Sequence, residues 1–405
     1  VDRGVWPDEV FLCNFIEGPN LTISGISNRE YDVRYTTPDG SAKYQVMQKP
    51  GMISRPSIKY YKDWTITAAL NGEIKFQHHI DLKGRRVLIS LGSKALGDTI
   101  AWMPYIDEFR KKHGCHVICS GWWQEIFDYP ELEFVKPGAQ VPDVYATYQV
   151  GCFDEQLDLN VKDWRLTPLQ KVAADILGLD YEPIRAKLKF TPHKKGNGSI
   201  PGPYVCFSEH STMRNKLWNR PGAWQELITY LNGQGFKCVC ISIEETERTG
   251  VVKHNNQSIQ NSIADIAGAD FYVGLNAGPS WIAYALGIPV VMITGVSEVW
   301  NDFPNPYRIA INNEVCGIGC FNDPNHKIDR GWEWCPRNKN YVCTREITPM
   351  MVAKVINKLL MDKGLTEDAG NAVKEGEKSE SNKRKHKRDD GGRTPAETGC
   401  GCGAE

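Results

Sequence analysis

The sequence predicts an α/β protein with two doubly wound halves and a small β region in front of them. Short apolar runs rich in β-branched residues alternate with segments of helical periodicity over residues 82–190, and again over 204–293. A stretch rich in Gly, Pro and Lys at 191–203 separates the two sets and is predicted to be an interdomain linker. Two such halves imply a ligand-binding cleft between them.

The composition is that of an ordinary globular protein. The chain has 405 residues, of which 41% are hydrophobic and 24% charged, so it can hold two or three domains. A formal net charge of −1 argues against nucleic-acid binding through bulk charge. No apolar run reaches the ~18–20 residues of a membrane span, and the N-terminus does not resemble a signal peptide. Several of the 13 cysteines lie in apolar runs, which fits a reducing compartment, and we expect a cytoplasmic protein.

Residues 1–80 are predicted to form an N-terminal β domain. Residues 31–47 alternate around Pro38-Asp39-Gly40, and Asn71-Gly72 joins the strands at 64–68 and 74–77 as a type I′ hairpin. A β unit of this size is marginal alone, so we expect it to pack on its neighbour or on another subunit.

Residues 81–192 are predicted to form the first doubly wound domain, with the chemistry in its first loop. The buried strand Arg86–Leu91 is followed by the glycine-bearing loop 92–98, and a helix covers about 98–112. The loop matches neither GxGxxG nor a Walker sequence. Asp98 has two interpretations, a helix N-cap, which residue type alone favours, and a general base held over a cleft. Further elements are expected at 116–119 (strand), 122–127 (helix), 148–150 (strand) and 169–177 (helix).

Residues 193–314 are predicted to form the second doubly wound domain. Strands are expected at 204–207, 236–243, 271–273 and 288–293, with helices at 223–231, 262–267 and 280–286. The segment 211–218 (STMRNKLW) follows the first strand, and its hydroxyls and cations suit a diphosphate, although a polar loop is the plain alternative. The segment 274–280 (GLNAGPS) runs into a helix, where small residues expose backbone N–H groups to a phosphate.

Four cysteines interrupt this pattern at 315–345. Cys316, Cys320, Cys335 and Cys343 have the spacing C-x3-C-x14-C-x7-C, which suits a closed tetrahedral site with a structural role. Disulfides and buried apolar cysteines are the alternatives, and four thiolates suit zinc and iron equally. A helix is predicted within 346–367, capped by Thr348 with Pro349 at its first position. Residues 368–405 are predicted to be a disordered charged tail, with a basic run at 383–388 and an incidental pair, Cys400 and Cys402.

These motifs resemble those of the bacterial heptosyltransferases over about residues 84–300. The shared residues are Gly97-Asp98 with Pro104, R-x-K-x-W at 214–218, G-x-x-x-G-x-S at 274–280 and Ala-Leu-Gly-Ile-Pro at 285–289. The resemblance implies a GT-B glycosyltransferase with two Rossmann-like domains and an ADP-heptose donor. It implies that Asp98 deprotonates the acceptor and that Lys216 neutralises the leaving diphosphate. Either Glu244 or Glu245 would hold the ribose. The donor-binding set it implies is Ser211, Thr212, Arg214, Trp218, Glu244, Glu245, Asn276, Gly278, Pro279 and Ser280.

The chain departs from the lipopolysaccharide-core enzymes at Asn276 and Trp281, where those enzymes usually have Asp and His. The N-terminal β region and the cysteine insert also depart from them, and both are similar to the autotransporter heptosyltransferases. That resemblance implies protein O-heptosylation of serines in an adhesin passenger domain, a dodecameric ring, and one cysteine-bound iron per chain. A D-x-D motif is not apparent, so no catalytic divalent metal is expected.

Three other functions compete with this interpretation. A lipopolysaccharide-core heptosyltransferase would share the chemistry, but the β region and the cysteine insert count against it. A nucleotide-sugar-binding scaffold without catalysis would not require the carboxylate of Asp98 at the cleft. A four-cysteine nucleic-acid-binding module is disfavoured by the near-zero charge and by the lack of interleaved aromatic and basic residues around the cysteines.

Overall fold

The computed structural model describes residues 2–6, 8–154, 156–190, 200–309, 316–317, 319–326 and 332–364. Residues 191–199 of the predicted linker lie outside these ranges, as do the predicted tail, its basic run and the Cys400–Cys402 pair. The chain divides into two compact units, Val1–Val355 and Ile356–Glu405, and the sheets and pocket described below belong to the first.

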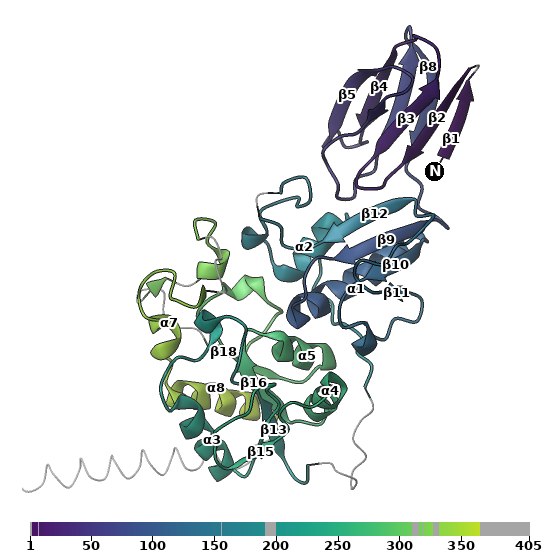
Figure 1. Cartoon of the computed structure of the whole chain (residues 1–405). Coiled ribbons are helices and arrows are strands. Elements are labelled where there is room, and N and C mark those ends of the chain that lie inside the picture. The colour runs from purple at the N-terminus through teal and green to yellow at the C-terminus, as the bar shows by residue number, and fades with distance from the viewer. Residues whose placement is uncertain are drawn as a thin grey trace, which may run out of the picture. The chain divides into compact units, whose positions relative to one another are not determined.

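The N-terminal region consists of two four-stranded antiparallel sheets, with strand orders β1-β2-β3-β6 and β5-β4-β7-β8 (Figure 1). Buried and solvent-facing residues alternate along β2 and β4, and the ring of Phe11 stacks on Phe76 of the other sheet at 5.3 Å. Asn71 and Gly72 both have positive φ, as the predicted type I′ hairpin requires. The strands are β1 (Asp2–Trp6), β2 (Glu9–Asn14), β3 (Asn20–Gly25), β4 (Tyr31–Thr36), β5 (Lys43–Gln48), β6 (Ile53–Ser54), β7 (Thr65–Leu70) and β8 (Glu73–His79).

The first Rossmann-like sheet is parallel and has the order β11-β10-β9-β12. The predicted helix at 122–127 is instead a single 3-10 turn at Gln124–Ile126, too short for a periodic pattern to define. Helix α1 is buried on most of its surface and lies in the core. The elements are β9 (Arg86–Leu91), α1 (Leu96–His113), β10 (His116–Ser120), β11 (Glu133–Val135), β12 (Ala146–Val150) and α2 (Leu169–Ile176).

The second Rossmann-like sheet has six parallel strands in the order β15-β14-β13-β16-β17-β18. This is the 3-2-1-4-5-6 order of dinucleotide-binding folds, and it confirms the predicted α/β class. The elements are β13 (Tyr204–Phe207), α3 (Ala223–Gly233), β14 (Lys237–Cys240), β15 (Val251–Lys253), α4 (Ile259–Ala267), β16 (Phe271–Leu275), α5 (Gly278–Leu286), β17 (Val290–Ile293) and β18 (Arg308–Ile309). Helix α8 (Pro349–Asp362) begins as predicted, with the Thr348 hydroxyl accepting from Met351 N at 3.2 Å.

The N-terminal sheets pack on their neighbour, the first Rossmann-like sheet. Phe15 N donates to Tyr145 O at 2.9 Å and Thr147 N donates to Phe15 O at 3.1 Å, so the backbone after β2 continues along β12. The imidazole of His78 on β8 hydrogen-bonds the Tyr145 hydroxyl at 2.6 Å. This joint supplies the partner surface that a small β unit needs.

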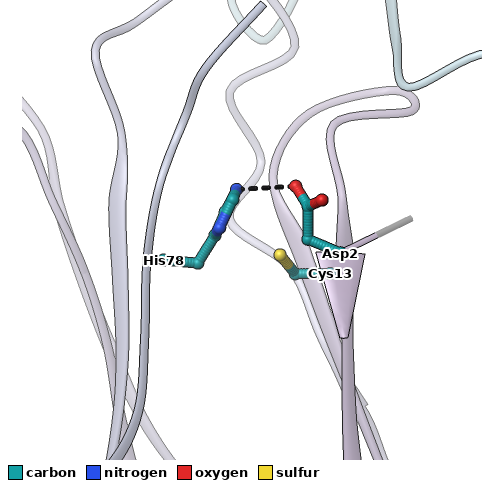
Figure 2. Close-up of side chains that lie close together, drawn as sticks. All are labelled: Asp2, Cys13 and His78. Carbon is teal, nitrogen blue, oxygen red and sulfur yellow. Dashed lines mark ion pairs between the residues drawn. The ribbon is translucent and has the colours of Figure 1, made fainter. Parts of the chain in front are cut away.

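Asp2, Cys13 and His78 gather at this joint (Figure 2). Among the described residues they form a group whose possible metal-ligating atoms all lie within 4.8 Å of one another, and Asp2 Oδ2 is 3.1 Å from His78 Nε2. Arg85 already forms an ion pair with Asp2, and burial lowers the pKa of His78, so the imidazole tends to be neutral. Arg85 is the cation that balances the carboxylate of Asp2. We therefore interpret the group as a polar contact that joins β1, β2 and β8.

Candidate functional site

A cavity of about 570 Å³ lies where the carboxyl ends of both parallel sheets meet, a volume typical of sites for small ligands. The loops after β9, β13 and β16 line it, and in each sheet the strand order reverses beside these strands. Ligands of open α/β sheets bind at such switch points. Among the described helices, none has the length and apolarity needed to cross a bilayer.

Asp98 lies in the wall of this cavity, on the third residue of α1. The N-cap position is Ala95, without a side-chain cap, so the N-cap interpretation of Asp98 is wrong. The carboxylate instead accepts a hydrogen bond from Ser93 Oγ at 2.6 Å. The pKa of Asp98 is raised, because burial outweighs the hydrogen bond from Ser93 and the charge of Lys216.

Lys216 lines the same cavity from the second Rossmann-like sheet, in a 3-10 turn after β13 (Arg214–Lys216). Its Nζ lies 5.3 Å from the centroid of the Phe321 ring, within cation–π range. Burial lowers the pKa of Lys216, while the carboxylates of Asp98 and Asp302 act in the opposite direction. The structure thus brings a carboxylate and an ammonium group from separate sheets into one pocket.

The predicted donor-binding residues separate into two groups. Six of them line the pocket: Ser211, Thr212, Glu244, Asn276, Gly278 and Pro279. Of the two adjacent glutamates, Glu244 therefore faces the cavity and lies 3.5 Å from Nδ1 of His210. No side chain caps the first turn of α5, which begins at Gly278. Pro279 has no N–H, and Ser280 N donates to Ala277 O at 3.1 Å. Of the first three residues of α5, only Gly278 can therefore offer its N–H to an anion.

The other four predicted donor-binding residues are not among the residues that line the pocket. Trp218 is buried and donates Nε1–H to Ile347 O at 2.9 Å. Ser280 is also buried, and its hydroxyl donates to Leu275 O at 2.6 Å. Arg214 lies over the ring of Tyr341, 5.6 Å from its centroid, and Glu245 is exposed.

Two glycines allow α1 and α5 to approach each other beside the pocket. A Cβ added at Gly97 would lie 3.0 Å from Trp281 Cδ1, and one added at Gly278 would lie 2.9 Å from Leu96. Trp281, the residue that replaces the usual His, is buried and packs edge-on against Phe303 at 4.9 Å. Trp281 also lines the cavity, so it both packs at the contact between the helices and forms part of the pocket wall.

Several pocket residues were missed in the sequence. Trp123 follows β10, has a φ of 62°, and donates Nε1–H to Lys94 O at 3.0 Å. Asp302 follows β17, and Phe321 belongs to the cysteine insert. Their position in the sequence could have identified them, because polar and aromatic residues that follow the carboxyl ends of parallel strands converge on one edge of the sheet.

The cysteine insert contacts both Rossmann-like parts beside the pocket. Asn322 donates to Arg165 O and to Asn301 Oδ1, both at 2.9 Å. The adjacent Phe321 ring packs edge-on against Trp164 at 5.2 Å. A distortion of this insert would therefore reach the cavity wall directly.

The four predicted metal ligands influence one another electrostatically. Burial, followed by the thiols of Cys316, Cys320 and Cys335, raises the pKa of Cys343 to about 12. Cys320, Cys335 and Cys343 are buried, while Cys316 is half-buried. The thiols are close enough to influence one another, but among the described residues no three of them have sulfur atoms within 4.8 Å of one another, so this structure does not bring the four predicted ligands together as a metal site.

No family model matches the chain, but the similar proteins that are described below are all named autotransporter heptosyltransferases. The autotransporter heptosyltransferase TibC of Escherichia coli O78:H11 is 33% identical over an alignment of 343 residues, which covers 78% of this chain and 82% of TibC. The autotransporter heptosyltransferase BAHTCr of Citrobacter rodentium is 32% identical over 327 residues, 75% of this chain and 78% of the relative. BimC of Burkholderia thailandensis, described as an inactive autotransporter heptosyltransferase, is 28% identical over 326 residues, 74% of this chain and 75% of BimC.

Comparison with solved structures also finds TibC. The crystal structure of the iron-containing dodecameric glycosyltransferase TibC superposes with a TM-score of 0.80 at 28% identity, covering 88% of this chain and 96% of TibC. The structure of dodecameric TibC in complex with ADP-D-β-D-heptose also has a TM-score of 0.80, at 27% identity and with the same coverage of both chains.

Proposed function

The chain belongs to the autotransporter heptosyltransferases, and from that premise we propose that it transfers heptose from ADP-heptose to serine hydroxyls of an adhesin passenger domain. The observation that carries this proposal is the presence of Asp98 and Lys216 in one cavity. A non-catalytic scaffold would not need this pair. The inactive relative makes that alternative worth testing.

The residues of the pocket suit each part of the reaction. Asp98 takes the proton of the serine hydroxyl, and the serine oxygen then bonds to the anomeric carbon of the heptose. The bond between that carbon and the diphosphate oxygen breaks, and ADP leaves with the bonding electrons. Lys216, with the hydroxyls of Ser211 and Thr212, meets the charge that develops on the diphosphate. Glu244 faces the cavity and is placed to accept from the ribose hydroxyls.

Co-expression with an autotransporter adhesin tests the function. Intact-mass analysis should show the passenger domain heavier by whole heptose residues, and peptide mapping should place them on serines. Co-expression with the Asp98→Asn variant should leave most of the passenger domain unmodified. An unmodified adhesin alongside a heptosylated lipopolysaccharide core would favour the lipopolysaccharide-core alternative. Unmodified acceptors of both kinds would favour the scaffold.

The finer architecture also belongs to this proposal. We propose an N-terminal β domain (1–80), an acceptor-side domain (81–192), a donor-binding domain (193–314), a four-cysteine metal-binding insert (315–345) and a C-terminal helix (346–367), assembled as a dodecamer in the bacterial cytoplasm. The dodecameric relative supports the assembly.

We propose further that Cys316, Cys320, Cys335 and Cys343 bind one iron per chain, with zinc as the alternative. The donor set fits either metal, because four thiolates suit tetrahedral coordination by both. Lys339 N donates to Cys335 Sγ at 3.3 Å, and the iron-containing relative favours iron. When bound, the ion would supply ligand bonds that hold the insert in shape.

Replacing Cys320 or Cys335 with Ser is expected to remove the metal, weaken the oligomer and lower activity. The reason is that the described part of the insert forms only the short turns Cys320–Asn322 and Val342–Arg345, so ligand bonds would hold its shape. Asn322 and Phe321 connect the insert to the pocket. Elemental analysis and size-exclusion chromatography provide the measurement. Cys115→Ser, at a buried cysteine outside the insert, is the control that should keep its metal. A metal-free Cys335→Ser protein of unchanged size and activity would contradict the proposal.

A further inference from the structure

A third carboxylate, that of Asp302, lies in the wall of the proposed donor pocket together with those of Asp98 and Glu244. It follows the 3-10 turn Val299–Asn301, and its side chain is only 1% exposed. Arg308, itself 6% exposed, forms an ion pair with Asp302 Oδ2, and the Ser297 hydroxyl donates to the same oxygen at 3.2 Å. The carboxylate is therefore fixed in place before any ligand arrives.

Asn276 is part of the same arrangement. Its amide group donates to Ser297 Oγ at 2.7 Å and to Asp302 Oδ2 at 3.3 Å. Only a donor fits here, because a carboxylate at 276 would face that of Asp302 at about the same separation, where like charges cannot both ionise readily. The site thus has room for one negative charge, and Asp302 carries it.

The second oxygen of Asp302 has capacity for a ligand. Among the described residues, the hydrogen bond found for Oδ1 comes from Asn301 Nδ2 at 3.2 Å, whereas an ionised carboxylate oxygen accepts about two. Asn276 and Asn301 line the cavity beside it. A carboxylate flanked by two carboxamides is a chemistry that recognises neighbouring hydroxyl groups, which both donate and accept.

We propose that Asp302 is a specificity-determining residue for the donor sugar, with Oδ1 accepting a hydrogen bond from a sugar hydroxyl. Arg308, Ser297 and Asn276 hold the other carboxylate oxygen, Oδ2, in the cavity wall. This inference rests on the proposed function, because it assigns the contents of that pocket as a nucleotide sugar.

The Asp302→Asn variant separates sugar recognition from nucleotide binding. Calorimetric titration should show ADP-heptose binding weakened by about 10-fold or more, the usual effect of losing a hydrogen bond to a charged group, with ADP affinity unchanged. Asp107→Asn is the matched control, since Asp107 is also buried and paired with an arginine, Arg110, but does not line the pocket. Equal weakening for both ligands would assign Asp302 a purely structural role, and unchanged binding of both would also overturn the proposal.

Exchanging the two side chains tests the location of the charge. Asn276→Asp alone should lower the melting temperature, because it adds a second carboxylate, and Asn276→Asp with Asp302→Asn should recover it. The double variant should still bind ADP-heptose weakly, since its carboxylate lies elsewhere. Full recovery of ADP-heptose affinity would overturn the assignment to Asp302. If the adhesin stays unmodified on co-expression but Asp302→Asn still weakens ADP-heptose binding, the proposed acceptor is wrong and the role of Asp302 stands.

Discussion

Replacing Asp98 with Asn is expected to lower heptose transfer by roughly 100-fold or more while ADP binding persists. A serine hydroxyl is a weak nucleophile near neutral pH, and the carboxylate of Asp98 is the acidic side chain on the acceptor side of the pocket, among the residues that line it. Asn keeps the size and can still accept from Ser93, but it cannot take a proton. Single-turnover transfer to a purified passenger domain, with ADP titration in parallel, measures both effects.

The pH profile gives an independent test of the same residue. Burial raises the pKa of Asp98, so its basic form should appear, and turnover should rise, at a pH above the usual carboxyl range. The same shift means that the folded protein loses stability as pH rises through this pKa, so Asp98→Asn should not lower the melting temperature at neutral pH. If Asp98→Asn has near-normal turnover and the same fall in turnover at low pH as the unmodified enzyme, then another residue is the general base.

Lys216→Ala is expected to reduce turnover by about 100-fold to 1,000-fold, as removal of a preorganised charge-stabilising donor does. Negative charge grows on the diphosphate as the glycosidic bond breaks, and Lys216 is the ammonium that faces Asp98 and Asp302 in the pocket. The Lys216→Arg variant should retain only part of the activity, because the planar guanidinium group does not reproduce the compact charge of the ammonium group. Steady-state kinetics with saturating acceptor give the comparison.

The matched control for Lys216 is Arg214→Ala. Arg214 is exposed over Tyr341 and does not line the cavity, so its loss should change turnover little. Added Mg²⁺ should not rescue Lys216→Ala, because the proposed mechanism assigns the stabilisation of the diphosphate charge to the side chain of Lys216 and not to a divalent cation. A strict requirement of the unmodified enzyme for a divalent cation would contradict this mechanism.

Much of the fold follows from local sequence patterns. The apolar run at 86–91 and the small residues at 274–280 predict a strand and a helix entrance, and both are present as β9 and the start of α5. Periodicity succeeds here because burial on both faces of a parallel strand produces continuous apolar runs. The same logic missed β18 and predicted a longer helix where the structure has the 3-10 turn at 124–126, because both elements are too short to show a period.

The sequence by itself determined the two Rossmann-like halves, the loops bearing Asp98 and Lys216, and the cysteine spacing. Only the tertiary structure decided that Glu244 rather than Glu245 faces the cavity, that Trp218 packs inward, and that Asp302 and Phe321 join the pocket. The physical reason is that hydrogen-bonding geometry and side-chain periodicity act over a few residues. Which loops converge, by contrast, depends on the order of the strands in each sheet and on how the insert packs against both sheets.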